Sequence, residues 1–484
     1  MNYKMMGRFL SVILALEAVF MAPALVISIA DGTTAASRAF LISIALTAAL
    51  AGLLALLSRR AEKNFFAKEG LFCVGFGWVL MSILGCLPFY LSGEIPHFID
   101  ALFEMVSGFT TTGASVVSNV EGLSRAILYW RSFSHWLGGM GVLVFLLAIV
   151  PVSGKNEGFT MHLLRAESPG PSVGKLVPKM RQTAAVLYIT YLVLTVINVL
   201  FLLAGDMPLF DSICTAFGTA GTGGFGIKND SMASYSPYIQ NVCTVFMLLF
   251  GVNFGCYYLL LLRRFREVLG DEELKLYFGV VAGSVLLITL NIRGLYPSIW
   301  DSLRHASFQV SSIITTTGFA TTDFDLWPSF SKGILLVLMF IGACAGSTGG
   351  GIKCARILLL LKSIKRNLAQ VLRPQKVQVI RVNQKAVDEK VIAGTNAYLC
   401  VYVAILVISF LIVSADGFSI TTNFSAVLSC FNNIGPGFDA VGPVCNFSIY
   451  SPLSKLVLIV NMLAGRLEIF PILVLFSAGT WKRS

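Results

Sequence analysis

Long apolar runs alternate with short polar or glycine-rich segments along the whole chain of 484 residues. A helix needs about 20 apolar residues to cross the ~30 Å hydrocarbon layer of a membrane. The first run is longer than the apolar part of a signal peptide, which spans about 7 to 15 residues, and it contains Glu17, so we interpret it as a retained helix. The pattern predicts ten membrane spans, at residues 9–30, 37–58, 69–92, 126–150, 183–204, 239–262, 276–292, 333–361, 391–415 and 453–479.

Four shorter stretches, each lying between two spans, end in threonine, asparagine and glycine. They read DALFEMVSGFTTTGAS (100–115), DSICTAFGTAGTGGFG (211–226), ASFQVSSIITTTGFAT (306–321) and TNFSAVLSCFNNIGPG (422–437). In the first, second and fourth, an Asp or Thr (Asp100, Asp211, Thr422) precedes a glycine by 13 residues, whereas Asp301 precedes Gly318 by 17, about one extra helical turn. Because their oxygens accept the unpaired amide protons of a first turn, we expect these residues to be helix N-caps.

Each short stretch predicts a helix that enters the membrane and turns back. About 10 to 12 helical residues span roughly 15 to 18 Å, which is too short to cross. Irregular backbone at membrane depth is tolerated where it is buried in protein or lines a water-filled cavity. A single turn of this kind could be a simple capping turn between helices, but four in register favour one shared axis. The sequence therefore predicts an all-α membrane protein with four helix, re-entrant pore loop and helix repeats in a pseudo-fourfold arrangement, preceded by two extra transmembrane helices.

The residues of the turns suit a monovalent cation. Glycine permits backbone angles that are closed to other residues, so successive carbonyls can face one direction. Rings of carbonyls can replace the hydration shell of an ion. The helices would also point their partially negative carboxyl ends at the axis, where a cation is favoured.

Composition and charge support a membrane protein rather than a nucleic-acid-binding one. Hydrophobic residues make up 56% of the chain and charged residues 13%, against about 25% charged in soluble domains. The net charge of +11 comes mainly from segments that the predicted spans place on one face, which the positive-inside rule makes cytoplasmic, with both termini: 1–8, 59–68, 155–181, 263–275, 353–390 and 481–484. The long basic loop with Lys362, Lys365 and Arg366 is either a docking surface or a topology signal alone.

Other residues predict no catalytic or transition-metal site. The ten cysteines are scattered without zinc-ligand spacing, and His135 and His305 are interpreted as structural. Glu17 and Asn253 lie in apolar spans, where we expect hydrogen bonds between helices. We expect no enzyme activity and no cofactor.

A glycine-rich break is expected in the long apolar segment from Pro328 to Lys362. It holds five glycines, at positions 342, 346, 349, 350 and 351. Since a glycine inside a helix costs about 1 kcal/mol relative to alanine, this segment should unwind easily. In the last span, Arg466 and Glu468 are two residues apart on a predicted helix, on different faces. We expect Arg466 to point into the pore; the alternative is a stabilising pair with a neighbouring helix.

The motifs SGFTTTGAS, GTGGFG, ITTTGFATTDF, FNNIGPGF, HWLGGMG and GACAGSTGGGIK resemble those of the TrkH family, the potassium-translocating subunits of the Trk, Ktr and HKT superfamily. The resemblance covers essentially the whole chain. It implies a K⁺ filter made of the carbonyl-bearing residues Thr111, Thr112, Gly113, Thr222, Gly223, Gly224, Thr316, Thr317, Gly318, Asn433, Ile434 and Gly435. It implies that the glycine-rich loop with Gly346, Gly349, Gly350 and Gly351 is the gate, and the expected position of Arg466 in the pore adds this residue to it.

The same resemblance implies the assembly and the location. These are a homodimer with one pore per chain, a cytosolic nucleotide-binding ring of the TrkA type, and the bacterial inner membrane. The expected function is gated K⁺ uptake, with Rb⁺ also passing and Na⁺ passing less well; the alternative is a symporter that couples K⁺ to H⁺ or Na⁺. The expected divisions are two N-terminal helices (1–60), repeat 1 (69–150), a cytoplasmic connection with repeat 2 (151–262), repeat 3 with its broken helix (274–362), the basic loop (363–390) and repeat 4 (391–484).

Overall fold

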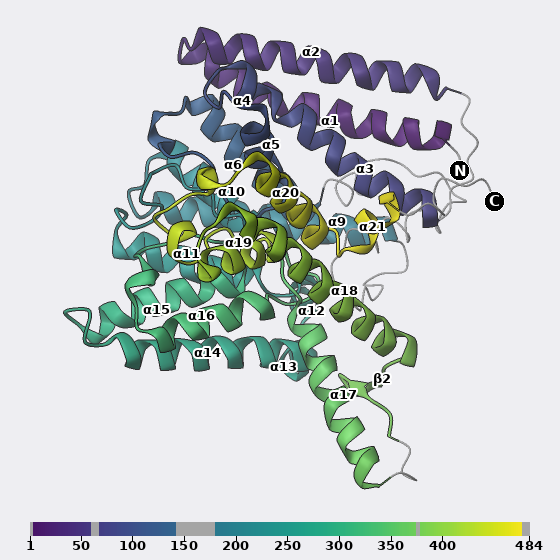
Figure 1. Cartoon of the computed structure of the whole chain (residues 1–484), viewed down its shortest axis with the longest axis vertical. Helices are drawn as coiled ribbons and strands as arrows, with labels where there is room; N and C mark the ends of the chain where they lie inside the picture. Colours follow the sequence, from purple (N-terminus) through teal and green to yellow (C-terminus); the bar gives the residue numbers. More distant parts are fainter. Residues whose placement is uncertain (1–2, 60–66, 142–179, 374–377, 477–484) are drawn as a thin grey trace.

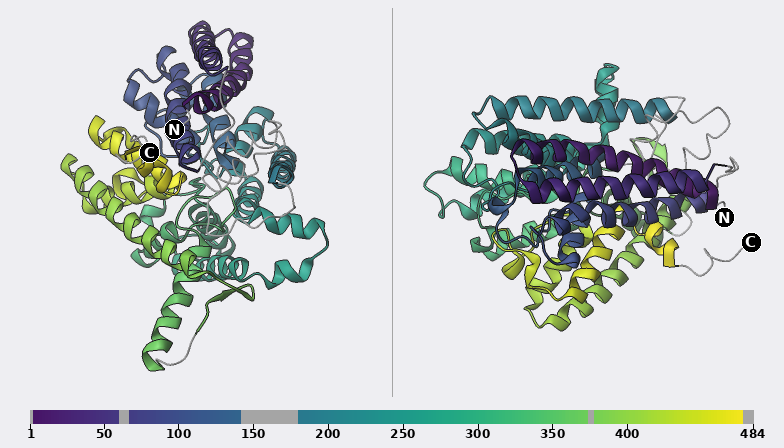
Figure 2. Two further views of the ribbon diagram at one scale, coloured as in Figure 1. Left: turned by 90° about the vertical axis from the view of Figure 1, so that its right-hand side faces the viewer. Right: turned by 90° about the horizontal axis from the view of Figure 1, so that it is seen from above.

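A computed structural model describes residues 3–59, 67–141, 180–373 and 378–476. Two long antiparallel helices, α1 (Tyr3–Ala30) and α2 (Thr34–Leu57), pack side by side along one edge of the molecule (Figure 1). Four units follow, each with a long helix, a short helix and a second helix on the way back. The start of α1 and the last helix, α21, lie at the same end of the molecule (Figures 1 and 2).

The four units lie in the order of the expected repeats, but the last helix of the third unit continues to Leu372, so the first ten residues of the basic loop expected at 363–390 are helical. Repeat 1 contains α3 (Ala67–Gly85), α4 (Leu87–Leu91), α5 (Phe98–Phe109) and α6 (Arg125–Met140). Repeat 2 contains α9 (Met180–Leu203), α10 (Leu209–Gly221), α11 (Pro237–Phe250) and α12 (Phe254–Leu261), and α13 (Phe265–Gly270) follows it. Repeat 3 contains α14 (Glu272–Ile292), α15 (Ile299–Ile314), α16 (Ser329–Ile341) and α17 (Cys354–Leu372). Repeat 4 contains α18 (Glu389–Val413), α19 (Ile420–Asn432), α20 (Pro452–Arg466) and α21 (Phe470–Phe476).

The remaining elements are short. The strands β1 (Arg381–Val382) and β2 (Lys385–Ala386) form a small antiparallel hairpin between repeats 3 and 4, with Arg381 opposite Ala386. Single 3-10 turns lie at Val120–Gly122, Phe324–Leu326, Ser414–Asp416, Asp439–Val441 and Phe447–Ile449. The prediction of an all-α membrane protein is therefore confirmed.

The outer helices carry the membrane-facing surface. Six helices of the described chain are long and apolar enough to cross a membrane, or seven if the bent pair α11 and α12 counts as one span. Their outward side chains are apolar and exposed, as at Val19 (64%) and Leu286 (60%), which suits contact with lipid. The short helices α5, α10, α15 and α19 lie inside this shell and are mostly buried.

The spans predicted at 239–262 and 453–479 are not continuous helices, so the second helix is broken in repeats 2 and 4 as well as in repeat 3. In repeat 2 the helices α11 and α12 meet at a break with a bend of 88°. In repeat 4 the break falls at Leu467–Ile469, between α20 and α21. In repeat 1 the helix α6 ends at Met140, and residues 142–150 of the predicted span lie outside the described residues, as does the basic segment 155–179. The four second helices thus stop at comparable lengths, of 16, 14, 13 and 15 residues.

The predicted helix caps also need correction. Asp100, Asp211, Asp301 and Thr422 are each the third residue of their helix rather than the residue before it. The caps are His97, Pro208, Ser298 and Ser419, and Ser419 accepts a hydrogen bond from the amide of Thr422. An acidic residue in the first turn is still favourable, because it faces the positive end of the helix dipole. The expected extra turn is present, since α15 has 16 residues against 12 or 13 in the other three short helices.

Candidate functional site

The four turns after the short helices share one backbone conformation. The first residue of each is left-handed, with φ of 54° at Thr111, 53° at Thr222, 58° at Thr316 and 56° at Asn433. Two residues later a glycine has positive φ again, at 78°, 78°, 85° and 108° for Gly113, Gly224, Gly318 and Gly435. The residues between them, Thr112, Gly223, Thr317 and Ile434, are not left-handed. A backbone that alternates hand in this way turns successive carbonyls toward the same side.

These glycines bring the four turns together in a closed ring. A Cβ added at each glycine would collide with a carbonyl oxygen of the next turn, at distances from 1.9 to 2.8 Å. The contacts run in cyclic order, from Gly113 to the Gly223 oxygen, Gly224 to Thr317, Gly318 to Ile434 and Gly435 to Thr112. All twelve residues expected in the filter therefore lie around one axis. Only glycine fits at the contact positions, because both the conformation and the spacing exclude a side chain.

Side-chain hydrogen bonds within and between the turns stabilise their conformation. The hydroxyls of Thr110 and Thr112 lie 2.8 Å apart, and those of Thr315 and Thr317 repeat this pair at 2.8 Å. Asn433 joins the fourth turn to the first by donating its Nδ2–H to Thr112 Oγ1 at 3.0 Å. Such bonds fix the turn and leave its conformation little freedom.

The fourth turn differs from the others. The Ser429 hydroxyl donates to the Gly435 carbonyl at 2.8 Å, whereas the corresponding serine of repeat 3, Ser312, donates to Phe319, one residue beyond its glycine. The φ of Gly435 is also the largest of the four. The ring is thus only approximately fourfold.

His135 joins the first two turns. Its ring is fully buried, with Nδ1 lying 2.8 Å from the Gly108 carbonyl, and Nε2 accepts from the Phe225 amide at 3.2 Å. These two partners assign the proton to Nδ1. His305, whose Nδ1 lies 3.0 Å from the Thr321 hydroxyl, is stacked on the ring of Tyr296. Both contacts fit the structural roles expected for these histidines.

An ion pair behind the first turn was not expected from the sequence. Arg131 Nε lies 2.5 Å from Glu104 Oε1, and their side chains are 3% and 0% exposed. The arginine also donates to the Gly226 carbonyl at 2.9 Å and lies over the ring of Phe225. Glu104 accepts from the Val116 amide at 2.9 Å. The sequence does show one acidic and one basic residue within apolar segments. That these two residues pair with each other becomes visible only in the folded structure.

The break in repeat 3 runs from Gly342 to Lys353 and packs against one side of the ring of turns. The Gly350 amide donates to the Thr316 hydroxyl at 2.6 Å. A Cβ on Gly349 would lie 2.9 Å from the Thr315 carbonyl, and one on Gly350 would lie 2.4 Å from the Asn432 carbonyl. Gly346, with φ of 71°, accepts a hydrogen bond from the Phe254 amide. The loop therefore contacts repeats 2, 3 and 4 at once.

Arg466 fastens this loop to repeats 1 and 4. It is the last residue of α20 and is 8% exposed. Its guanidinium donates to the Thr348 carbonyl of the loop at 2.7 Å, to the Gly139 carbonyl of α6 at 2.7 Å, and to the Gly138 carbonyl. The guanidinium is thus located on the same side of the ring as the loop and is held by main-chain oxygens.

Glu468 is not on a helix, contrary to expectation. It lies in the break after α20 with φ of 57°, and its carboxylate pairs with Arg356 of α17 at 2.5 Å. Lys353, at the end of the loop, is 1% exposed and donates to the Gly349 carbonyl. Three buried cationic side chains, those of Lys353, Arg356 and Arg466, therefore surround the loop. Asn253, which was expected to bond between helices, instead caps α12 by accepting from the Gly255 amide at 2.8 Å.

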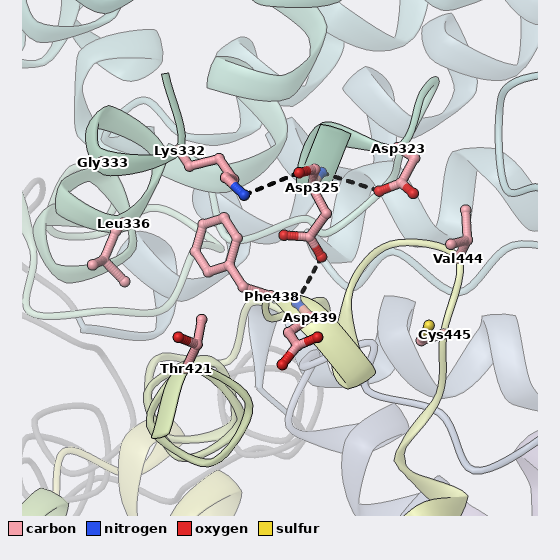
Figure 3. Close-up of a pocket in the computed structure, with 10 residues that line it drawn as sticks. All are labelled: Asp323, Asp325, Lys332, Gly333, Leu336, Thr421, Phe438, Asp439, Val444 and Cys445. Carbon is pink, nitrogen blue, oxygen red and sulfur yellow. Dashed lines mark hydrogen bonds between the residues drawn. The ribbon is translucent and has the colours of Figure 1, made fainter. Parts of the chain in front are cut away.

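A pocket opens between repeats 3 and 4 at the opposite end of the ring (Figure 3). Its volume is about 530 Å³, and Asp323, Asp325 and Asp439 lie along it with Lys332. The Asp439 amide donates to Asp325 Oδ2 at 2.6 Å, and Lys332 donates to the Asp325 carbonyl at 3.0 Å. Burial raises the pKa of Asp325, while hydrogen bonds from Ser419 and Thr422 lower the pKa of Asp439. In the described part of the chain, no three His, Cys, Asp or Glu side chains are grouped to hold a metal ion.

Comparisons with known proteins identify the family and agree with the fold. The model of the TrkH family, described as a cation transport protein, matches residues 36–291 and 296–482. The Trk system potassium uptake protein TrkH of Salmonella typhimurium is 37% identical over 454 residues, covering 92% of this chain and 93% of that protein. TrkH of Halomonas elongata is 33% identical over 491 residues and covers both chains fully. The crystal structure of the potassium transporter TrkH from Vibrio parahaemolyticus superposes with a TM-score of 0.88 at 31% identity over the whole of both chains. These relatives are transport proteins, not enzymes.

Proposed function

We propose, from the premise that the chain belongs to the TrkH family of cation transport proteins, that it takes up potassium ions through the ring of four turns. The observation that carries the proposal is the closed cycle of glycine-to-carbonyl contacts, because it gathers main-chain oxygens of all four repeats on one axis. Carbonyl oxygens so gathered can replace the water around a dehydrated cation. The chain is a multi-pass membrane protein, and its ligand is the transported ion rather than a cofactor.

In this proposal the filter is formed by the turns at residues 111–113, 222–224, 316–318 and 433–435. Each turn presents carbonyls in the same direction because its hand alternates. The departure at Gly435, whose oxygen accepts from Ser429, leaves the ring less regular than a fourfold-symmetric filter. Discrimination between K⁺ and Na⁺ should therefore be incomplete, with Rb⁺ passing readily.

The gate in this proposal is the loop 342–353, which includes Gly346, Gly349, Gly350 and Gly351. Arg466 holds this loop closed through its hydrogen bonds. The loop packs under the turns of repeats 3 and 4, so an ion leaving the ring meets it next. Arg466 adds a buried positive charge at the same level. A cation there raises the electrostatic barrier for K⁺. Opening requires the loop to leave its contacts with Arg466 and with the turns.

The proposed assembly is a homodimer controlled by a cytosolic nucleotide-binding ring of the TrkA type. The helix α17 projects from the body (Figures 1 and 2) and carries an exposed apolar stripe: Leu361, Ile364, Leu368, Val371 and Leu372. An exposed stripe at helical spacing supports contact with a second copy. The cations of the same helix, including Lys365, would face the cytoplasm together with both termini. A ring bound to this region could move α17 and hence the gate loop, which continues directly into it.

The decisive test is electrical recording from the purified protein in a planar bilayer, with and without its cytosolic partner. We expect single-channel currents carried by K⁺ and Rb⁺, with a reversal potential in mixed K⁺ and Na⁺ that shows measurable Na⁺ permeability. A fixed ratio of H⁺ or Na⁺ to each K⁺ would instead identify the alternative, a coupled symporter. If substitutions in the ring left the currents unchanged, the proposal that the ring is the selectivity filter would be refuted.

A further inference from the structure

Glu17 is a buried carboxylic acid that the ion path does not use. It is the fifteenth of the 28 residues of α1, so about 20 Å of helix separates it from either end. Its side chain is 1% exposed. The residue therefore lies near the middle of the membrane, inside the protein.

The carboxyl group lies where the N-terminal pair meets repeat 1. A Cβ built on Gly85 of α3 would lie 2.9 Å from Glu17 Oε1, 2.9 Å from the Phe109 ring and 3.2 Å from Met105. Both Phe109 and Met105 belong to α5, and Phe109 is the last residue of that helix, two positions before Thr111. The absence of a side chain at Gly85 makes the room that Glu17 occupies.

Neither oxygen of Glu17 finds a hydrogen-bond partner among the described residues. The titratable group that faces it is the thiol of Cys86, which donates to the Ile83 carbonyl. The hydroxyl of Thr47, on the adjoining helix α2, is likewise without a partner in the described chain.

The charged groups of the packed helices are engaged or lie elsewhere. Arg38 of α2 is exposed, and Glu69 is in the first turn of α3, far from Gly85. In α5 and α6, Glu104 pairs with Arg131, and Asp100 pairs with Lys455. His135 of α6 is bonded between Gly108 and Phe225. Arg125, at the outer end of α6, pairs with Asp31.

We propose that Glu17 is a proton-binding site, a neutral carboxyl that seats the N-terminal helix pair on the short helix of repeat 1. A carboxylate without a counter-charge is costly in an apolar interior, and such a group neutralises by binding a proton. Ionised residues at membrane depth pair with one another or face a water-filled cavity, and no described cation faces this one. The bound proton lets α1, Gly85 and Phe109 pack without water between them. Loss of the proton at alkaline pH would loosen this contact next to the first filter turn.

Infrared difference spectroscopy tests the protonation directly. The full chain in lipid nanodiscs is compared with Glu17→Gln, a neutral isostere, between pH 6 and 8. We expect the C=O stretch of a protonated carboxyl in the wild type and its loss in the variant. Glu104, which is ionised in its pair with Arg131, should contribute no C=O stretch of a protonated carboxyl. A carboxylate signal removed by the substitution, or a signal that depends on Na⁺ concentration, would overturn the proposal.

The stability of the same variant gives a second measure. The wild type must take up a proton on folding between about pH 4.3, the ordinary pKa of an exposed Glu, and the alkaline pH at which the folded protein loses that proton. Its unfolding equilibrium constant should therefore rise relative to that of Glu17→Gln by about tenfold per pH unit. Glu267→Gln, at an exposed position, should show no such change. A ratio independent of pH would overturn the proposal. So would a failure to fold of both Glu17→Gln and Glu17→Met, because it would mean that the negative charge is required.

Discussion

At the scale of single residues, the ring depends on the absence of four side chains. Gly224 has φ of 78°, and a Cβ on it would lie 1.9 Å from the Thr317 carbonyl oxygen. Gly224→Ala should therefore displace the second or third turn, at a strain of about 1–3 kcal/mol. We expect K⁺ flux into proteoliposomes to fall by roughly tenfold or more, with Na⁺ discrimination reduced as well.

The matched control is Gly279→Ala in α14, where nothing lies within 4 Å of the added Cβ. It should leave flux unchanged and stabilise the helix by about 0.5–1 kcal/mol. Full flux and unchanged selectivity in Gly224→Ala would show that the glycine contacts do not shape the permeation path.

The buried pair of Arg131 and Glu104 supports the first turn from behind. Removing one partner leaves the other charge buried and unpaired, which typically costs about 3–5 kcal/mol. Arg131→Met should therefore lower the thermal unfolding midpoint of the purified protein markedly. The double variant Arg131→Met with Glu104→Gln should recover part of the loss, since no lone charge remains.

The exposed pair of Arg125 and Asp31 provides the comparison, with side chains 57% and 25% exposed. Because water screens such a pair, Arg125→Met should cost no more than about 1 kcal/mol. Equal losses for Arg125→Met and Arg131→Met would contradict the assignment of the Arg131 pair as a buried support.

At the scale of elements, much of the architecture is readable from the sequence and some of it is not. Apolar length and the recurring glycine motif predict the long helices and the four turns. The break in repeat 3 is predictable because five glycines fall together. The break in repeat 4 is not, because Glu468 and Ile469 adopt positive φ without any glycine. Tertiary contacts hold that conformation, among them the ion pair of Glu468 with Arg356.

In the candidate site, too, some features can be predicted from the sequence and others cannot. The glycines of the ring are predictable, since their conformation is a local requirement. The roles of side chains are harder, because partners come from distant segments: Arg466 follows Thr348 by 118 residues, and Arg131 follows Glu104 by 27. The misplaced caps have another cause. An Asp serves well both as the cap and in the first turn, so its presence fixes the start of the helix only to within three residues.

The gate loop allows a prediction at the scale of an element. Arg466 holds the loop through Thr348 and holds α6 through Gly138 and Gly139. A charged donor contributes about 1.5–3 kcal/mol per hydrogen bond. Arg466→Ala removes these bonds and the buried charge together, so we expect Rb⁺ uptake to rise at equal surface expression.

A second variant separates the loop from the charge. In Gly350→Ala the added Cβ would lie 2.4 Å from the Asn432 carbonyl, so the loop must move away while Arg466 remains. Uptake should rise here too, whereas Gly394→Ala, with open space around its Cβ, should match the wild type. A loop that is only a passive kink would leave uptake unchanged in both Arg466→Ala and Gly350→Ala.

At the scale of the whole molecule, the two ends differ in charge. One end carries the acidic pocket of Asp323, Asp325 and Asp439, and the other carries α17 with its cations Lys362, Lys365 and Arg366. The helix α20 runs from the first end to the second, where α21 lies beside α3 (Figure 1). In the proposed orientation the basic end faces the cytoplasm, as the positive-inside rule expects, and the acidic end faces outward, where it would raise the local concentration of cations.

A native cysteine can test this orientation without an engineered label. Cys445 is exposed beside the acidic pocket, whereas Cys400, the other exposed cysteine of the described chain, lies on the membrane helix α18. A charged maleimide that cannot cross the membrane should therefore label intact cells at Cys445, and Cys445→Ser should abolish the label.

Burial, and then the carboxylates of Asp323, Asp325 and Asp439, raise the pKa of the Cys445 thiol. Because the thiolate is the reacting form, labelling should be slow at neutral pH and accelerate as the pH rises. Asp325→Asn should speed labelling at a fixed pH, since it removes one of these negative charges. Labelling that appears only after the cells are permeabilised would place the acidic pocket on the cytoplasmic side and reverse the proposed orientation.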